Sequence, residues 1–192
     1  GYVVKLLVTA RLAHGRIQAR VHPVFLPQGH PLAKVDGVYN AVELEGDLVD
    51  WAMFQGPGAG AAPTASAVLA DIVAEARAIA GEISLPAISL VSRNLPLEPI
   101  DELEIKYYLR VRVYDRPGVL AQITTVFGDL AVSLASFIQK EGGELGDGTE
   151  VVITTHVAKE SAVQEAVRRL EALDSVSEVG SLVRIEERSS SV

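Results

Sequence analysis

The chain of 192 residues contains no cysteine. It therefore forms no disulfide bond, uses no thiolate nucleophile and offers no cysteine ligand to a metal, and we expect it in a reducing compartment such as the cytoplasm. The four histidines, His14, His22, His30 and His156, are scattered without the spacing of metal ligands. We expect them at surface or turn positions and predict no metal site.

The chain also lacks an excess of positive charge and any long apolar run. A formal net charge of -8 gives no general attraction to nucleic acid or to anionic membrane surfaces, so we expect neither as a partner and favour a small metabolite. No apolar stretch approaches the roughly 20 residues of a membrane helix, and the N-terminus has no secretion-signal pattern. The sequence begins inside what reads as a strand, without an initiator methionine, and we interpret it as a fragment.

Hydrophobic residues make up 48% of the chain and charged residues 22%, which is typical of a folded protein of one or two domains. Apolar and β-branched runs at 2–9 and 16–25 predict a first hairpin, and runs at 37–44 and 48–55 predict a second. Helical spacing of apolar residues then predicts a helix that begins near Pro63 and stops at Gly81. We expect residues 82–105, which contain three prolines, to be a linker.

The remaining sequence, residues 106–187, shows a regular succession of periodicities, and residues 188–192 form a short tail. The alternation of Leu109, Val111 and Val113 with polar residues predicts a half-buried strand. The predicted order is βαββαβ, with helices at 117–130 and 161–173, later strands at 132–140, 150–157 and 179–185, and a glycine-rich hairpin at 142–148. This order is typical of a ferredoxin-like plait, an antiparallel sheet covered by two helices on one face. The whole chain is thus predicted to be an α/β (α+β) protein with a mixed or antiparallel sheet in its first part.

One motif follows the first strand of this plait, Asp115-Arg116-Pro117-Gly118-Val119-Leu120. Gly118 lets backbone approach backbone, and the next helix begins with unpaired N–H groups that can hold a carboxylate. Taken alone, the motif is better explained by a type I turn that leads into a helix, with no ligand.

Within its βαββαβ frame the motif resembles that of ACT domains, over roughly residues 106–187. The resemblance implies an amino-acid pocket between this loop and the second strand of a partner domain, here residues 133–139. It also implies that the uncovered sheet face, which we expect to be apolar, is buried against a second copy. Ala131 departs from the family pattern, which has glycine before this strand, and a left-handed backbone is costly for alanine. The implied effector-binding residues are Arg116, Pro117, Gly118, Val119, Ser133, Ser136 and Gln139.

Residues 1–81 resemble the end of the catalytic region of homoserine dehydrogenases. The resemblance rests on the stretches at 1–7, 30–42 and 56–68, the last reading Gly-Pro-Gly-Ala-Gly-Ala-Ala-Pro-Thr-Ala-Ser-Ala-Val. It implies that Gly60 contacts a nicotinamide cofactor, NAD or NADP, with Gly58 and Ala59 beside it. The same glycines formally match a dinucleotide-binding fingerprint, but two prolines interrupt it and no second acidic-ended strand follows. A role in close helix–strand packing is an open alternative.

The resemblance implies an oxidoreductase that interconverts L-homoserine and aspartate 4-semialdehyde in threonine and methionine biosynthesis. The Rossmann domain and the catalytic Asp and Lys of this family lie upstream of the region seen in this chain, so we assign no catalytic residue and expect the chain alone to be inactive. We expect a homo-oligomer, at least a dimer, with threonine as the effector. The alternative is a non-catalytic module for amino-acid sensing and dimerisation, which the sequence upstream of Gly1 would distinguish.

Overall fold

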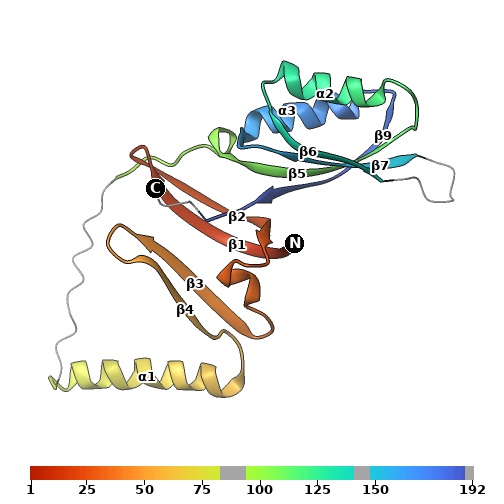
Figure 1. Cartoon of the computed structure of the whole chain (residues 1–192). Helices are drawn as coiled ribbons and strands as arrows, with labels where there is room; N and C mark the ends of the chain where they lie inside the picture. Colours follow the sequence, from red (N-terminus) through yellow and green to blue (C-terminus); the bar gives the residue numbers. More distant parts are fainter. Residues whose placement is uncertain (83–93, 141–147, 189–192) are drawn as a thin grey trace. The chain divides into compact units, whose positions relative to one another are not determined.

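The computed structural model describes residues 1–82, 94–140 and 148–188 (Figure 1). Residues 1–28 and 95–192 group into one unit, and residues 29–94 into a second. The N-terminal hairpin therefore belongs with the C-terminal half of the chain, although some 70 residues separate the two in sequence.

The first hairpin pairs β1 (Tyr2–Ala13) with β2 (Arg16–Pro27), and the register runs without a shift from Tyr2↔Pro27 to Ala13↔Arg16. His14 and Gly15 form the turn, with φ of 51° and 73°. Positive φ at both central residues is the geometry that matches the twist of a two-residue hairpin. The predicted hairpin is confirmed, and each strand is longer than predicted.

The predicted βαββαβ order is also confirmed in residues 104–185. Four antiparallel strands follow one another as β9-β5-β7-β6, and α2 and α3 cover one face of this sheet (Figure 1). A two-residue strand, β8 (Ala158–Lys159), and a short 3-10 helix, η2 (Ile100–Glu102), were not predicted. The elements are β5 (Glu104–Val113), α2 (Val119–Asp129), β6 (Leu134–Lys140), β7 (Thr149–Thr155), α3 (Glu160–Glu171) and β9 (Val176–Ile185). The glycine-rich hairpin predicted at 142–148 lies, except for Gly148, outside the described residues.

The main core lies between this sheet and its two helices. Alternate residues of β5 point under the helices, which confirms the half-buried pattern of that strand. Each such side chain contributes about 1.5–3 kcal/mol by leaving water, so the alternation fixes which face the helices cover. The largest buried members are Tyr107, Leu109, Ile123, Phe127, Ile153 and Leu170.

The hairpin joins this sheet through a parallel contact between β2 and β9. Val24 pairs with Arg184 and Phe25 with Ile185, and the N–H of Glu186 donates to the carbonyl of Phe25 at 3.0 Å. The other end of β2 is held as well, because the N–H of Ile17 donates to the carbonyl of Pro96 at 2.9 Å. One continuous sheet results, in the order β1-β2-β9-β5-β7-β6.

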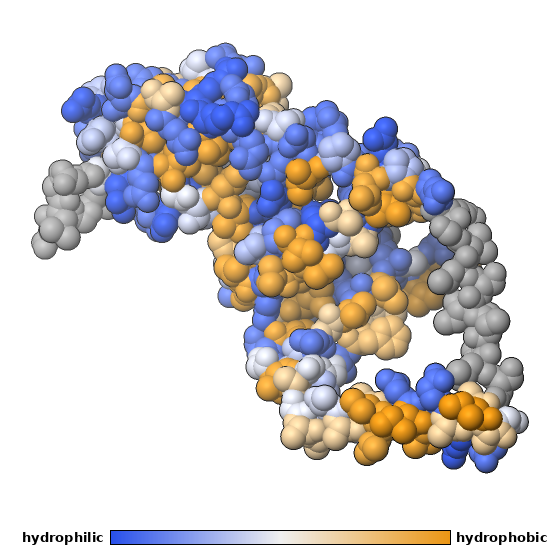
Figure 2. Space-filling view, turned by 180° about the vertical axis from the view of Figure 1, so that it is seen from behind, coloured by the Kyte–Doolittle hydropathy of each residue, from blue (hydrophilic) through white to orange (hydrophobic). Residues whose placement is uncertain are grey.

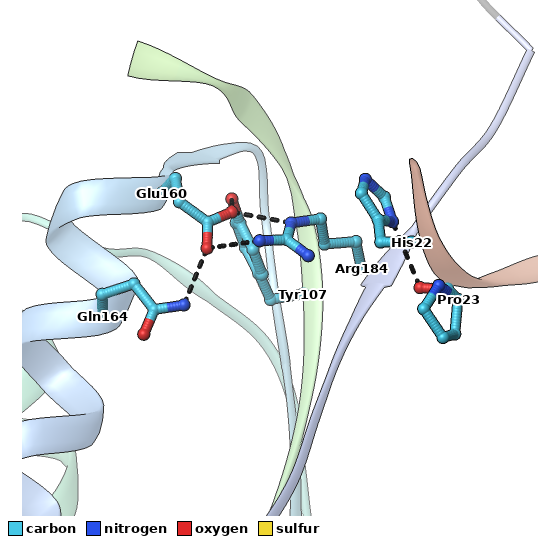
Figure 3. Close-up of polar contacts among 6 residues, drawn as sticks. All are labelled: His22, Pro23, Tyr107, Glu160, Gln164 and Arg184. Carbon is cyan, nitrogen blue, oxygen red and sulfur yellow. Dashed lines mark hydrogen bonds and ion pairs between the residues drawn. The ribbon is translucent and has the colours of Figure 1, made fainter. Parts of the chain in front are cut away.

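A buried polar cluster stands where α3 begins, close to this junction (Figure 3). The Glu160 carboxylate, whose side chain is only 3% exposed, accepts two hydrogen bonds from the Arg184 guanidinium at 2.6 and 2.7 Å. The Tyr107 hydroxyl donates to it at 2.9 Å and the Gln164 amide at 2.7 Å. Burial alone would raise the pKa of Glu160, but these hydrogen bonds outweigh it and lower that pKa. Burial and the Glu160 charge together raise the pKa of Tyr107.

The second unit contains a 3-10 helix η1 (Pro31–Lys34), a hairpin of β3 (Tyr39–Gly46) and β4 (Asp50–Pro57), and helix α1 (Ala61–Ile79). These confirm the second hairpin and the helix, and Gly81 follows the helix end with φ of 72°. No residue of α1 is buried, and Figure 2 shows hydrophobic side chains on its surface. Among the described residues, no helix is long and apolar enough to cross a membrane.

His30 lies in the predicted turn but is buried rather than exposed. Its Nδ1 accepts a hydrogen bond from the N–H of Leu32 at 3.2 Å and so caps η1. Its Nε2 lies 3.6 Å from Oε1 of Glu43, whose side chain is also buried. The ring thus ties η1 to the β3–β4 hairpin inside this unit.

The Glu160 cluster predicts a pH-dependent stability. Because its folded pKa is lowered, the carboxylate stabilises the fold at pH above its unfolded pKa, and this contribution is lost as pH falls through the folded pKa. Glu160→Gln should therefore lower the free energy of unfolding at pH 7 by about 2 kcal/mol, and the difference from wild type should shrink in acid. Urea unfolding followed by circular dichroism at pH 7 and at pH 3 measures this.

The matched control is Glu178→Gln, which breaks an Arg112–Glu178 pair whose two side chains are each 56% exposed. Exposed pairs contribute about 0–1 kcal/mol, so this variant should stay close to wild type. Equal losses in the two variants would contradict the role assigned to the buried cluster.

Candidate effector and cofactor sites

The loop between β5 and α2 has the geometry of a helix start that lacks a side-chain cap. Gly118 is the N-cap residue of α2, with a left-handed φ of 92°, and no side chain bonds to the first turn. A Cβ built on Gly118 meets nothing within 4 Å. Within one chain, then, no close contact requires this glycine, and the left-handed backbone does.

The electrostatics of this loop suit an anion. The first turn of α2 contains no acidic residue, so nothing there offsets the partial positive charge of its N–H groups. The N–H of Val119 donates to the carbonyl of Arg116 at 3.3 Å and that of Gln122 to the carbonyl of Gly118 at 3.1 Å, so the amides of Leu120 and Ala121 are the ones left at the helix start for an anion. The Arg116 guanidinium lies 5.3 Å from the centre of the Tyr114 ring, which holds a cation beside the same turn.

The three polar residues predicted on the second strand do not converge within one chain. The Ser136 hydroxyl lies 2.6 Å from that of Thr154, on the sheet face that the helices leave uncovered. Phe137 packs against the core on the other face, and Gln139, two residues further, shares that side. Ser133 precedes β6, and its carbonyl accepts the N–H of His156 at 2.9 Å. Ser136 and Gln139 therefore face opposite sides of the sheet.

The sheet register also fixes which end of β6 lies near the loop. Val113, at the end of β5, pairs with Thr149, and Lys140, at the end of β6, pairs with the neighbouring Glu150. The loop that follows Val113 thus lies at the sheet end where Gln139 stands. Ser133 lies at the opposite end, so one chain alone does not bring it to the loop.

Ala131 adopts the left-handed backbone that the departure from the family pattern predicts, with φ of 55°. The turn is nevertheless intact. The N–H of Ala131 donates to the carbonyl of Gly128 at 3.0 Å, and that of Val132 donates to the carbonyl of Phe127 at 2.9 Å. These bonds close the C-terminus of α2 despite the strain on an alanine.

The glycine cluster predicted for cofactor contact lies between β4 and α1. A Cβ on Gly58 would stand 2.0 Å from Nδ2 of Asn40, so a larger residue there would have to displace the Asn40 side chain. Gly60 is the N-cap residue of α1 with φ of 129° and ψ of 143°, a conformation that glycine adopts readily and other residues avoid. Ala59 is exposed between them. The contact with Asn40 is consistent with the packing alternative at Gly58, and the backbone at Gly60 is exposed.

The uncovered face of the ACT-like sheet is charged, not apolar as predicted. The Arg112–Glu178 pair lies at 3.1 Å, Arg110–Glu150 at 3.7 Å and Lys140–Glu150 at 2.8 Å. The hydrogen bond from Lys140 lowers the pKa of Glu150. A partner that buried this face would have to desolvate these ions.

The strain at Ala131 gives a direct test of its backbone. Ala131→Gly should raise the free energy of unfolding by up to about 1 kcal/mol, because relief of roughly 1–2 kcal/mol of left-handed strain exceeds the added entropy of the unfolded chain. Ala121→Gly, inside α2, should instead lower the free energy of unfolding by about 1 kcal/mol. Chemical denaturation of both variants measures whether each one gains or loses stability. A loss of stability in Ala131→Gly would contradict the left-handed assignment.

Comparison with known proteins finds two family matches that follow one another along the chain, whereas the structure groups residues 1–28 with the second of them. Residues 1–73 match the homoserine dehydrogenase family and residues 107–175 match the ACT domain. The chain is 38% identical to a homoserine dehydrogenase of Pseudomonas aeruginosa, over 96% of this chain and 43% of that protein. It is 39% identical to that of Neisseria gonorrhoeae, over 97% and 44%.

A crystal structure of a homoserine dehydrogenase from Thiobacillus denitrificans superposes with a TM-score of 0.82 at 37% identity, and the match covers 97% of this chain and 43% of that one. The chain thus spans less than half the length of the relatives it matches. Across that span the chain matches the C-terminal, ACT-domain-bearing part of homoserine dehydrogenases.

Proposed function

We propose that this chain is the regulatory end of an NAD- or NADP-dependent homoserine dehydrogenase, which interconverts L-homoserine and aspartate 4-semialdehyde. The observation that carries the proposal is the match of residues 1–73 to that family in the same chain as an ACT domain at 107–175. We do not expect the chain to catalyse the reaction alone. Hydride transfer needs cofactor, substrate and a proton donor held together, and the glycine loop at 58–60 supplies one wall of such a site.

In this proposal, Gly60 lies against the nicotinamide cofactor with Gly58 and Ala59 beside it. Two observations support it: the three residues are exposed, and a Cβ on Gly60 would meet only the ring of Pro63, at 3.3 Å. The bound cofactor would supply or accept the hydride. The chain's own contribution would be a bare strip of backbone that admits a planar ring without steric conflict.

The second part of the proposal is an amino-acid effector site that needs two copies of the chain. β6 is an outer strand of the sheet in the described residues, so its free edge can pair antiparallel with the same edge of another copy. Pairing centred near Phe137 would bring Ser133 of the partner subunit to the sheet end where the loop lies. This supports a site in which Arg116, Pro117, Gly118 and Val119 hold the effector carboxylate and residues 133–139 of the partner read its polar groups.

Within that set, the sheet geometry favours Ser133 as the residue that reads the effector. Ser136 already shares a hydrogen bond with Thr154 on the uncovered face, and Gln139 faces the other side. We propose threonine as the effector, because it is an end product of the pathway and carries a hydroxyl that Ser133 can bond. A helix N-terminus contributes only about 0.3–1 kcal/mol per charge, so specificity must come from such hydrogen bonds.

The alternative is a module for amino-acid sensing and dimerisation without nearby chemistry. The observation that favours it is the joint sheet of the N-terminal hairpin and the ACT-like strands, which gives this chain a folded unit of its own. A Rossmann glycine fingerprint and an Asp-x3-Lys pattern upstream of Gly1 would decide for the dehydrogenase.

Effector binding is tested by isothermal titration of the chain with threonine, methionine, isoleucine and lysine. We expect threonine to bind, and Gly118→Asp to abolish binding because it places a negative charge where the carboxylate lies. Gly118→Asn is the matched control, since both residues have similar size and tolerance of a left-handed backbone but only one is charged. Silence from all four amino acids, or equal binding by the Asp variant, would leave the domain as a dimerisation element.

Cofactor contact is tested in a full-length enzyme that carries these residues. Gly60→Val should raise the KM for the nicotinamide cofactor more than Gly60→Ala does, because both strain the same backbone while valine adds more bulk toward the cofactor. The strain alone costs about 1–2 kcal/mol of stability, so thermal unfolding of both variants must accompany the kinetics. Equal KM values for the two variants would indicate that Gly60 is required only for its backbone conformation.

A further inference from the structure

Residues 156–159 lie between two buried residues that hydrogen bonds hold in place. Before them, Thr155 is 1% exposed, and its hydroxyl accepts the N–H of Tyr107 at 3.0 Å. After them, Glu160 is 2% exposed, and its N–H donates to the carbonyl of Leu103 at 2.8 Å. None of the four residues in between is buried. We call this short segment the connector.

The connector is held at both of its ends and by one short strand. At its start the N–H of His156 donates to the carbonyl of Ser133 at 2.9 Å, and at its end Nζ of Lys159 lies 2.6 Å from Oε2 of Glu102. Its last two residues form β8, which pairs with β5 over two positions. Short and exposed pairing opens at a low free-energy cost. The connector can therefore lie against β5 or detach from it, while the buried residues on either side stay in place.

The charge of Lys159 favours the attached position of the connector. The hydrogen bond with Glu102 raises the pKa of Lys159, and the charges of Glu104 and Glu98 also raise it. One ammonium group thus faces three carboxylates, which belong to β5 and to the chain just ahead of it. Detachment of the connector would separate this cation from its anions.

The chain just ahead of β5 is also the covalent route between the two units. Residues 95–103, which we call the linker segment, lead from the end of the second unit into β5. The N–H of Glu98 donates to the carbonyl of Ile17 in β2 at 2.9 Å, so the hairpin holds the start of this segment. Near its other end, Glu102 is held by Lys159 of the connector. A change in the Lys159 contact therefore acts on the linker segment.

We propose that the connector carries the effect of amino-acid binding from Ser133 to the linker segment. The inference rests on the proposed function, in which the loop of one copy holds the effector and Ser133 of the other copy reads it. A hydrogen bond between the Ser133 hydroxyl and the effector restrains the residue whose carbonyl accepts the N–H of His156. Binding thereby favours the attached connector, with Lys159 against Glu102. An effector on the loop of one copy therefore acts on the linker segment of the other.

The other polar contact of this strand offers a less suitable route. The Ser136 hydroxyl lies 2.6 Å from that of Thr154 in β7, and β7 pairs with β5 over six positions. A strand held at six positions inside a sheet has no second position that an effector could favour. Coupling between sites requires an element with two arrangements, and the connector, next to Ser133, meets this requirement.

Hydrogen exchange followed by mass spectrometry tests this on the 192-residue chain, with and without threonine. We expect threonine to slow the exchange of amides in residues 156–159 and 100–105 by roughly fivefold or more, the lower end of typical coupling between sites. Residues 4–10 of β1 serve as the internal reference, in which exchange should not change.

Charge reversal at Lys159 gives a second readout. Lys159→Glu should remove the slowing in residues 100–105, because it sets a fourth carboxylate among three, and should weaken threonine binding by roughly threefold or more, because coupling is reciprocal. Glu102→Lys, added to this variant, should restore both. The matched control is Lys106→Glu, which breaks a contact with Glu187 of the same 2.6 Å length, away from the connector. It should change neither, and circular dichroism checks that all variants are folded.

The possible failures of the connector and of the effector site are distinct. Threonine that binds without slowing exchange in the connector and the linker segment overturns the inference and leaves the effector site intact. The inference is likewise overturned if Lys159→Glu and Lys106→Glu behave alike. Silence of the titration with all four amino acids overturns the effector site itself, and the inference with it.

Discussion

The parallel contact between β2 and β9 is the constraint on which the larger unit depends. It is short, with two residue pairs in register and one flanking hydrogen bond from Glu186. It nevertheless converts a hairpin and a ferredoxin-like plait into a single sheet, and the Arg20–Glu186 ion pair adds a side-chain link between the two at 2.7 Å. Without this contact β9 would be an outer strand, and the hairpin would have no neighbour in the sheet.

The same sheet explains why one chain does not complete the proposed effector site. In a ferredoxin-like plait the loop after the first strand and the start of the second strand lie at opposite ends of the sheet, as Val113 and Ser133 do. An antiparallel partner reverses the second strand and brings its start to the loop. In the proposed site, the need for two copies would therefore follow from strand direction, whichever amino acid were the effector.

Local patterns in the sequence predicted nearly every helix and strand in the described residues, since alternation and helical spacing report burial within one element. β5, α2 and α3 show this clearly, as do both hairpins. The β2–β9 contact was beyond such reasoning, because nothing local to Val24 or Ile185 signals a partner some 160 residues away. The charged face of the ACT-like sheet could have been found, since Arg110, Arg112, Glu150 and Glu178 all occupy outward positions in their strands.

Site residues were harder to predict than helices and strands. The same residue type can be required at a position for different structural reasons, and the sequence does not show which reason applies. Glycine at 118 fits a left-handed backbone, whereas glycine at 58 lies against the side chain of Asn40. In the sequence these two structural reasons for a glycine look the same. Ala131 shows the converse, since its two backbone hydrogen bonds hold a left-handed turn that alanine disfavours. At all three positions the residue type is explained by the backbone conformation or by a neighbouring side chain. The folded structure is therefore needed to tell a glycine that serves binding from one that serves the fold.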